Sequence, residues 1–313
     1  MSQLLSLDPK HIEVIAPASF SPREEYEFAK VKLESWGFKV STAHAFNAGE
    51  HPFFSNTDAH RLTEIKKAIY ESDAKYIWCM RGGYGTPKLL SSMSHWELPK
   101  KKLKGQKCLI GFSDITALHQ FFNVQWGFKT IHGPGLSSFS NPHLDPKSLD
   151  DIKKLLLGKI PSAMTLEYLN KELGEVDLCA KTTGGTLTLI NGSLGTPFQF
   201  QFKNKFLLIE DVGERGYKID RYLNQLLLSG LLKGVKAIVF GDFTLSDEKD
   251  GKNYVNFAIQ EFIHELKNIG IKCPVFKTNE FGHGNLNRPF ILNGLYHIKS
   301  RGAKAALKSR ESL

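Results

Sequence analysis

Short apolar runs alternate with amphipathic stretches through the first half of the chain, and this alternation is the strongest constraint on the fold. A helix is expected from Pro22 to Trp36, and Thr57 is expected to cap a second one. The strand-like runs occupy residues 12–18, 38–43, 74–80 and 108–111. Alternation of this kind favours a parallel sheet with helices on both faces.

Ligands of such sheets gather at the carboxyl ends of the strands. Three candidate functional residues follow strand-like runs at this end: Arg81 in "RGGYG", Ser113 in "IGFSD" and His132 in "TIHGPG". The topology therefore predicts that these residues share one edge of the sheet.

The second half mixes strands and helices less regularly, and its pattern indicates only an α/β or α+β arrangement. The period is lost between about Leu156 and Lys181. We therefore expect an N-terminal domain over residues 1–160, a linker over 161–180 and a C-terminal domain over 181–313.

Composition narrows the functional classes. The net charge is +9, but the lysines of Pro99–Lys107 and the basic tail lack interleaved aromatic residues. We therefore interpret these lysines as solvated and expect no nucleic-acid partner. No apolar run is long enough for a membrane span, and the N-terminus lacks the features of a secretory signal. Four scattered cysteines indicate free thiols, so the expected location is the cytoplasm.

Ser113 stands at a predicted strand-to-helix corner, two residues after Gly111. Such an elbow exposes a nucleophile, and the helix N-terminus supplies amide donors for an oxyanion. The hydrolase pattern G-x-S-x-G is incomplete here, because Ile115 stands where the last glycine would be. The alternative is that Ser113 only caps the following helix.

A serine nucleophile needs a base, and the base needs an acceptor that orients it. Among the 11 histidines, His283 in "FGHGN" lies between two glycines, and His132 competes with it. The acid candidate is Glu210 or Asp211, which end the apolar run "KFLLIED".

The "RGGYG" turn leaves three interpretations open. It lacks the P-loop and dinucleotide glycine patterns, so a phosphate loop has little support. It is otherwise a turn that needs glycine dihedral angles, or a loop that brings a backbone amide to an oxyanion with Arg81 nearby.

Several segments occur in an order that resembles the LD-carboxypeptidase family of serine peptidases, which also contains the microcin C immunity peptidases. They are "WCMRGGYG", "IGFSDITALH", "HGP", "TTGGTLTLINGSLGTP", "LLIEDVGERGYKIDRYLNQL" and "FGHG". The resemblance implies a Rossmann-like N-terminal domain, a smaller mixed α/β C-terminal domain and a homodimer. It also implies removal of the terminal D-alanine from peptidoglycan tetrapeptides, without metal or cofactor.

The resemblance assigns roles by position. Its G-[FY]-S-D element makes Ser113 the nucleophile, its L-E-D element makes Glu210 the acid, and its late G-H element makes His283 the base. The implied oxyanion donors are the amides of Asp114 and Gly83.

A carboxypeptidase must bind a free carboxylate, for which arginine is the natural partner. Arg81 is the first candidate, and Arg215 and Lys218 are the alternatives. Lys88 replaces the family's usual arginine, and "FILNG" departs from the usual strand after the histidine. Two other functions remain open: hydrolysis of microcin C-like peptidyl-nucleotides, and binding of wall peptides without catalysis.

Overall fold

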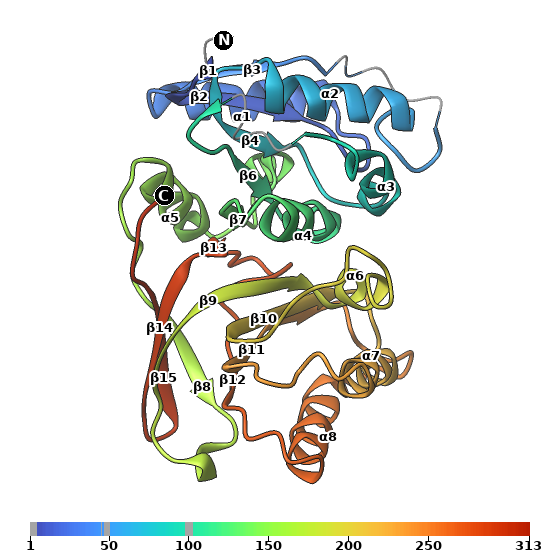
Figure 1. The fold of residues 1–313 in the computed structure, drawn as a ribbon, viewed down its shortest axis with the longest axis vertical. Coiled ribbons are helices and arrows are strands. Elements are labelled where there is room, and N and C mark those ends of the chain that lie inside the picture. The colour runs from blue at the N-terminus through green and yellow to red at the C-terminus, as the bar shows by residue number, and fades with distance from the viewer. Residues whose placement is uncertain (1–4, 45, 47–50, 98–102) are drawn as a thin grey trace. The chain divides into compact units, whose positions relative to one another are not determined.

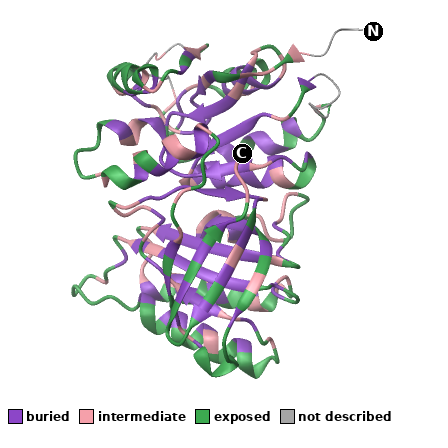
Figure 2. Ribbon diagram, turned by 90° about the vertical axis from the view of Figure 1, so that its left-hand side faces the viewer, coloured by how far each residue is buried: buried purple, intermediate pink, exposed green. Residues whose placement is uncertain are grey.

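The computed structural model describes residues 5–44, 46, 51–97 and 103–313 and divides into two compact units, Met1–Leu144 and Asp145–Leu313. Each unit has its own set of buried positions, which follow the strands in Figure 2. Within the described ranges, no helix combines the length and apolarity needed to cross a bilayer.

A parallel sheet forms the centre of the first unit (Figure 1), as the apolar runs predict. Its strands are neighbours in the order β7-β6-β4-β2-β3, and each pairing is parallel. Their bounds are β2 (Asp8–Ile15), β3 (Lys39–Thr42), β4 (Ala74–Cys79), β6 (Cys108–Gly111) and β7 (Thr130–His132). A separate parallel pair consists of β1 (Leu5–Ser6) and β5 (Leu103–Lys104).

The helices of this unit begin close to the predicted positions. Thr57 caps the second helix, because its hydroxyl accepts a hydrogen bond from the amide of His60. The longer helices are α1 (Arg23–Ser35), α2 (Asp58–Tyr70) and α4 (Thr116–Gln125). The short ones are η1 (Thr86–Leu89), α3 (Leu90–Met93), η3 (Ser113–Ile115) and η4 (Leu136–Ser140). Helix α2 packs on β2 and β4, and α4 packs on β6 and β7.

A closed seven-stranded barrel forms the second unit (Figure 1), with the strand order β10-β11-β12-β8-β15-β14-β9. The run β9-β10-β11-β12 is parallel, whereas the pairings that close the ring through β8, β15 and β14 are antiparallel. The bounds are β8 (Met164–Tyr168), β9 (Asp177–Thr186), β10 (Lys205–Val212), β11 (Ala237–Thr244), β12 (Val275–Lys277), β14 (Leu295–Arg301) and β15 (Lys304–Ser309).

Three helices join the parallel strands of the barrel in turn, and their apolar faces pack on it. They are α6 (Leu187–Gly192), α7 (Gly216–Leu228) and α8 (Val255–Asn268). This core includes Leu223 of α7, Phe240 of β11 and Phe262 of α8. Full burial of a side chain of this size contributes about 1.5–3 kcal/mol. The unit also contains α5 (Pro146–Leu156), η5 (Lys171–Leu173) and β13 (Phe290–Leu292).

The structure differs from the expected domain description in three respects. The two units divide after Leu144, whereas the sequence pattern placed the boundary at 160. The expected linker, residues 161–180, contains β8 and the start of β9, because these strands are needed to complete the ring. The C-terminal unit is also the longer of the two, not the smaller.

Part of the lysine-rich run Pro99–Lys107 lies outside the described residues. Lys107 itself is not a solvated lysine: it is fully buried, and its ammonium donates hydrogen bonds to the carbonyl oxygens of Ser72 and Ala74 at 2.6 and 2.8 Å. Burial lowers its pKa to about 8. The interpretation of this residue as solvent-exposed was wrong.

Candidate active site

Ser113 lies at a sharp turn between β6 and the helical segment that follows. Its φ of 62° is in the left-handed region, which residues other than glycine rarely adopt. Phe112 and Ile115 occupy the positions before η3 and α4, and no side chain caps either helix. Ser113 is therefore not an N-cap, and its strained backbone has the geometry of a nucleophile elbow.

The "RGGYG" turn lies directly against this elbow. A Cβ atom at Gly82 would lie 2.6 Å from the Cβ of Ser113, so only glycine fits there. Gly83 has a φ of 107°, and a Cβ there would lie 2.2 Å from the Oγ of Ser19. Ser19 also binds the turn through its own amide, which donates to the carbonyl of Gly82 at 3.2 Å. The turn is thus fixed beside Ser113 by backbone contacts.

Asp114 anchors the other side of the elbow. Its carboxylate accepts a hydrogen bond from the amide of Thr86 at 2.7 Å, and its carbonyl accepts one from the Thr86 hydroxyl at 2.5 Å. Burial raises the pKa of Asp114, and the hydrogen bonds from Thr86 oppose that rise. The side chain of Asp114 therefore holds the turn, which leaves its backbone at the start of the helix.

Glu210 and His283 form a hydrogen-bonded pair in the C-terminal unit. Nδ1 of His283 lies 2.5 Å from Oε2 of Glu210, and the Thr186 hydroxyl donates to Oε1 at 2.6 Å. Glu210 is fully buried, and 13% of the His283 side chain is exposed. Because Nδ1–H donates to the carboxylate, Nε2 is the nitrogen that can accept a proton.

Burial lowers the pKa of His283, but the charge and hydrogen bond of Glu210, together with two further acidic groups, outweigh burial, and the net pKa is raised. Asp211 and Asp242 act in the same direction. Burial and the neighbouring Glu210 charge raise the pKa of Asp211 to about 6. The pair is therefore set in an acidic surrounding that favours an imidazolium.

The glycines on both sides of His283 have a structural cause. A Cβ at Gly282 would lie 3.1 Å from the Cβ of Asp242, and one at Gly284 would lie 2.0 Å from its Oδ2. The amide of Asp242 also donates to the carbonyl of Phe281 at 2.8 Å. The histidine loop is therefore pressed onto the end of β11.

Comparisons with known proteins identify the family. Residues 12–133 match the LD-carboxypeptidase N-terminal domain, and residues 180–298 match the LD-carboxypeptidase C-terminal domain. The chain belongs to the LD-carboxypeptidase family. It is a carboxypeptidase by this membership.

Named relatives cover most of this chain. A murein tetrapeptide carboxypeptidase of Pseudomonas aeruginosa is 30% identical over 88% of this chain and 89% of its own length. A putative carboxypeptidase of Rickettsia conorii is 34% identical over 92% and 87%. The crystal structure of muramoyltetrapeptide carboxypeptidase from Oxalobacter formigenes has a TM-score of 0.80, with 25% identity over 97% of this chain and all of that one. The wild-type microcin C7 self-immunity protein shares the fold at a TM-score of 0.80, with 19% identity over 99% of this chain and all of that one.

Several of the site residues expected of an LD-carboxypeptidase lie together within each unit. Ser113, Asp114 and the Gly82–Gly83 turn lie together in the first unit, and Glu210 and His283 lie together in the second. The competing His132 is fully buried in β7, next to the rings of Phe112 and His119.

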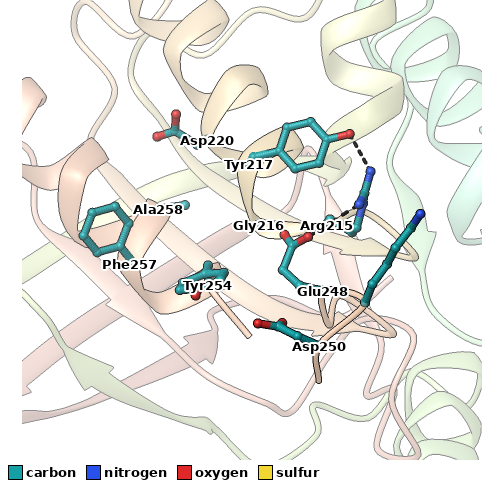
Figure 3. A pocket seen from close by; sticks show the side chains of 10 residues that line it. Arg215, Gly216, Tyr217, Asp220, Glu248, Asp250, Tyr254, Phe257 and Ala258 are labelled. Carbon is teal, nitrogen blue, oxygen red and sulfur yellow. Dashed lines mark hydrogen bonds and ion pairs between the residues drawn. The ribbon is translucent and has the colours of Figure 1, made fainter. Parts of the chain in front are cut away.

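The three candidate cations lie in different surroundings. Arg81 is exposed at the end of β4 and donates one hydrogen bond, at 3.3 Å, to the carbonyl of Phe20. Arg215 contacts Tyr217 and Glu248, as Figure 3 shows. Lys218 forms an ion pair with Glu214 at 3.0 Å.

Sequence patterns did not indicate the residues that support the candidate site. Thr186 binds Glu210, Thr86 binds Asp114, and Asp242 lies against the histidine loop. Thr186 lies in the segment "TTGGTLTLINGSLGTP" and Thr86 directly follows "WCMRGGYG", but no periodicity indicates the partners of either threonine. Among the described residues, no group of three or more His, Cys, Asp or Glu side chains could hold a metal ion.

Proposed function

We propose that this LD-carboxypeptidase removes the terminal D-alanine from murein tetrapeptides by a serine mechanism. The names of two relatives support this substrate. The P. aeruginosa relative is named a murein tetrapeptide carboxypeptidase, and a relative from Bacillus subtilis, 30% identical over 74% of this chain, is named a probable murein peptide carboxypeptidase. The single observation that carries the serine mechanism is the strained backbone of Ser113 at the end of β6.

In the proposed mechanism, Nε2 of His283 removes the proton of Ser113 as its Oγ attacks the carbonyl carbon before D-alanine. Glu210 accepts from Nδ1–H and stabilises the imidazolium that forms, as in other catalytic triads. The raised pKa of His283 supports this role, since the protonated ring must persist until it donates to the leaving amine.

The tetrahedral intermediate carries a negative charge on the former carbonyl oxygen. We assign its stabilisation to the backbone amides of Asp114 and Gly83. The anchoring of both segments supports this role, because fixed donors need not reorganise during the reaction. The C–N bond then breaks, D-alanine leaves with the proton from His283, and water hydrolyses the serine ester.

Arg81 is the cation that we assign to the terminal carboxylate of the substrate. It is exposed, it immediately precedes the Gly82–Gly83 turn, and its one hydrogen bond to the described part of the chain leaves other guanidinium N–H groups for a ligand. A Km for the tetrapeptide that is unchanged in Arg81→Ala would exclude this assignment.

Mass spectrometry of a murein tetrapeptide incubated with wild-type protein and with Ser113→Ala tests the proposal. Loss of one D-alanine with wild type alone is expected. Loss with both proteins would exclude Ser113 as the nucleophile. Loss with neither would exclude this substrate and direct the assay to peptidyl-nucleotides. We also propose a homodimer in the cytoplasm, and a monomer mass by light scattering would contradict that assembly.

A further inference from the structure

A cavity of about 610 Å³ opens in the C-terminal unit beside α7 and α8 (Figure 3). We call it the α7–α8 pocket and define it by Arg215, Tyr217, Asp220, Glu248, Tyr254 and Phe257. Its residues belong to the segments that follow the parallel strands β10 and β11. Glu210 and Asp242 lie near the carboxyl ends of the same two strands, where α/β proteins bind ligands.

Arg215 presents a guanidinium group to this pocket in a fixed position. Nη2 donates to the Tyr217 hydroxyl at 2.8 Å, and the guanidinium carbon lies 4.7 Å from the centre of the Tyr217 ring. Nη1 lies 3.6 Å from Oε2 of Glu248, which is an ion pair and too long for a hydrogen bond. The guanidinium therefore keeps N–H groups for a ligand carboxylate.

Carboxylates line the pocket beside this arginine. Glu248 is mostly buried, and Asp220 is exposed and forms no ion pair within the described part of the chain. Asp250 and the cation Lys249 also line the pocket. Three carboxylates therefore accompany two cations, and this balance disfavours a ligand that carries only negative charge, such as a phosphate or a lone terminal carboxylate. The carboxylates attract an ammonium group. The pocket thus offers partners to both halves of a zwitterion.

Two aromatic rings supply apolar walls. Tyr254 and Phe257 are 43% and 64% exposed, respectively, although both are large apolar side chains. Rings in this position can cover the methylene groups of a long aliphatic side chain. The walls and the charges together match a hydrocarbon chain that ends in an amino acid head group.

We propose that the α7–α8 pocket binds the zwitterionic end of the substrate's third residue, with Arg215 on the carboxylate and Glu248 on the ammonium. This inference rests on the proposed function. It selects a diaminopimelate side chain, which ends in both groups, over a lysine side chain, which ends in an ammonium alone. It also means that Arg215 does not bind the terminal carboxylate of D-alanine. The nitrogen of that D-alanine belongs to the scissile amide bond, so the D-alanine end is not a zwitterion.

Calorimetry on the Ser113→Ala protein tests the pocket without turnover. Two tetrapeptides that differ only in meso-diaminopimelate or lysine at the third position are compared. We expect the diaminopimelate peptide to bind about tenfold more tightly, the effect of one charge-assisted hydrogen bond. Adding Arg215→Met should reduce this ratio to about twofold or less, and Arg215→Lys should retain part of it.

Arg221→Met is the matched control. Arg221 is exposed on the same helix, and its guanidinium carbon lies 5.5 Å from the centre of the same Tyr217 ring, but it does not line the cavity. Its loss should leave the ratio unchanged. No side chain caps α7, so Arg215→Met removes no helix cap. If Arg215→Met does not fold, Glu248→Gln is used in its place. This variant should weaken the binding of both peptides, because both carry the ammonium group.

The outcomes separate the two proposals. Equal affinity for the two peptides, or a ratio that Arg215→Met leaves intact, overturns the pocket inference, while hydrolysis by wild type would still support the proposed function. Binding with the expected ratio but no hydrolysis of either peptide by wild type would overturn the function and leave the pocket. If Arg215→Met does not fold, unchanged affinities in Glu248→Gln would equally overturn the pocket inference.

Discussion

Gly82 lies so close to Ser113 that a Cβ atom at residue 82 would come within 2.6 Å of the serine Cβ and 3.0 Å of its Oγ. The turn that carries Gly82 is held by backbone contacts with Ser19, and the elbow that carries Ser113 is held by Thr86. Neither the turn nor the elbow can move away easily, so the orientation of the Ser113 hydroxyl depends on the absence of a methyl group at residue 82.

Gly82→Ala should therefore displace Ser113. We expect a loss of about 1–3 kcal/mol in the free energy of unfolding from overpacking. We also expect a fall of about 100-fold in kcat/KM, because a misplacement near 1 Å has this effect. Gly192→Ala is the control, since a Cβ there meets nothing within 4 Å. Full activity of Gly82→Ala in the peptide assay would contradict the crowding argument.

Glu210→Gln keeps the size of the side chain and removes its charge. The pKa of His283 should fall, because the Glu210 charge and hydrogen bond are the largest contributions that raise it. We expect kcat/KM to fall by about 10³–10⁴-fold, as for other triad acids. An NMR titration measures the pKa. His119 serves as the internal reference: burial lowers its pKa to about 3, so it should not titrate between pH 5 and 9 in either protein. An unchanged His283 pKa would remove the acid from the proposed mechanism.

The same pair predicts how stability depends on pH. A folded-state pKa above the ordinary value of 6.5 means that protonated His283 stabilises the native protein. This contribution is complete below about pH 6.5 and is lost as the pH rises through the folded-state pKa. Urea unfolding should therefore show a larger advantage of wild type over Glu210→Gln at pH 6 than at pH 9. An advantage that grew toward pH 9 would refute the direction of the shift.

Thr186→Val tests the residue that supports the acid. It removes the hydroxyl that donates to Oε1 of Glu210 and leaves that buried oxygen without this hydrogen bond. We expect the free energy of unfolding to fall by about 1–3 kcal/mol. If Thr186 orients the triad, kcat should fall while KM for the tetrapeptide stays constant. Thr186→Ser restores the hydroxyl and should recover kcat, whereas a serine variant as slow as valine would assign Thr186 to packing alone.

Asp73→Asn addresses a separate pair in the first unit. Asp73 hydrogen-bonds with Nδ1 of His11, and this bond holds the pKa of the carboxyl below its ordinary value. The stabilisation is present above the unfolded-state pKa near 3.9 and is lost as the pH falls through the folded-state value. The difference between wild type and Asp73→Asn should therefore shrink from pH 5 to pH 2 in chemical unfolding. A constant difference across this range would show that the pair is not linked to pH.

The parallel sheet and the elbow could be predicted from sequence because both depend on local patterns. The apolar runs that became β2, β4 and β6 are bounded by glycine or polar residues, and Ser113 follows β6 directly. Glu210 and His283 could be paired only through motif order, since 73 residues separate them and no periodic signal connects them.

The barrel could not be predicted for a related reason. Strand β8 lies in a segment without clear period, and its partners β12 and β15 come more than 100 residues later. Pairing between strands that are so far apart in the chain leaves no periodic pattern in the local sequence. Residues 161–180 were therefore predicted to be a linker. The prediction for Lys107 was wrong for the opposite reason. Its charge predicts exposure to solvent, whereas its ammonium group is buried and donates hydrogen bonds to two backbone carbonyls.

Closure of the ring also bears on how the protein behaves at high concentration. β15 bridges β8 and β14, so every strand of the barrel has two neighbours and the ring has no edge strand whose row of backbone amides could pair with another molecule. Detachment of β15 would expose two such rows at once. We therefore expect β-sheet aggregation of this unit to begin with the local detachment of β15.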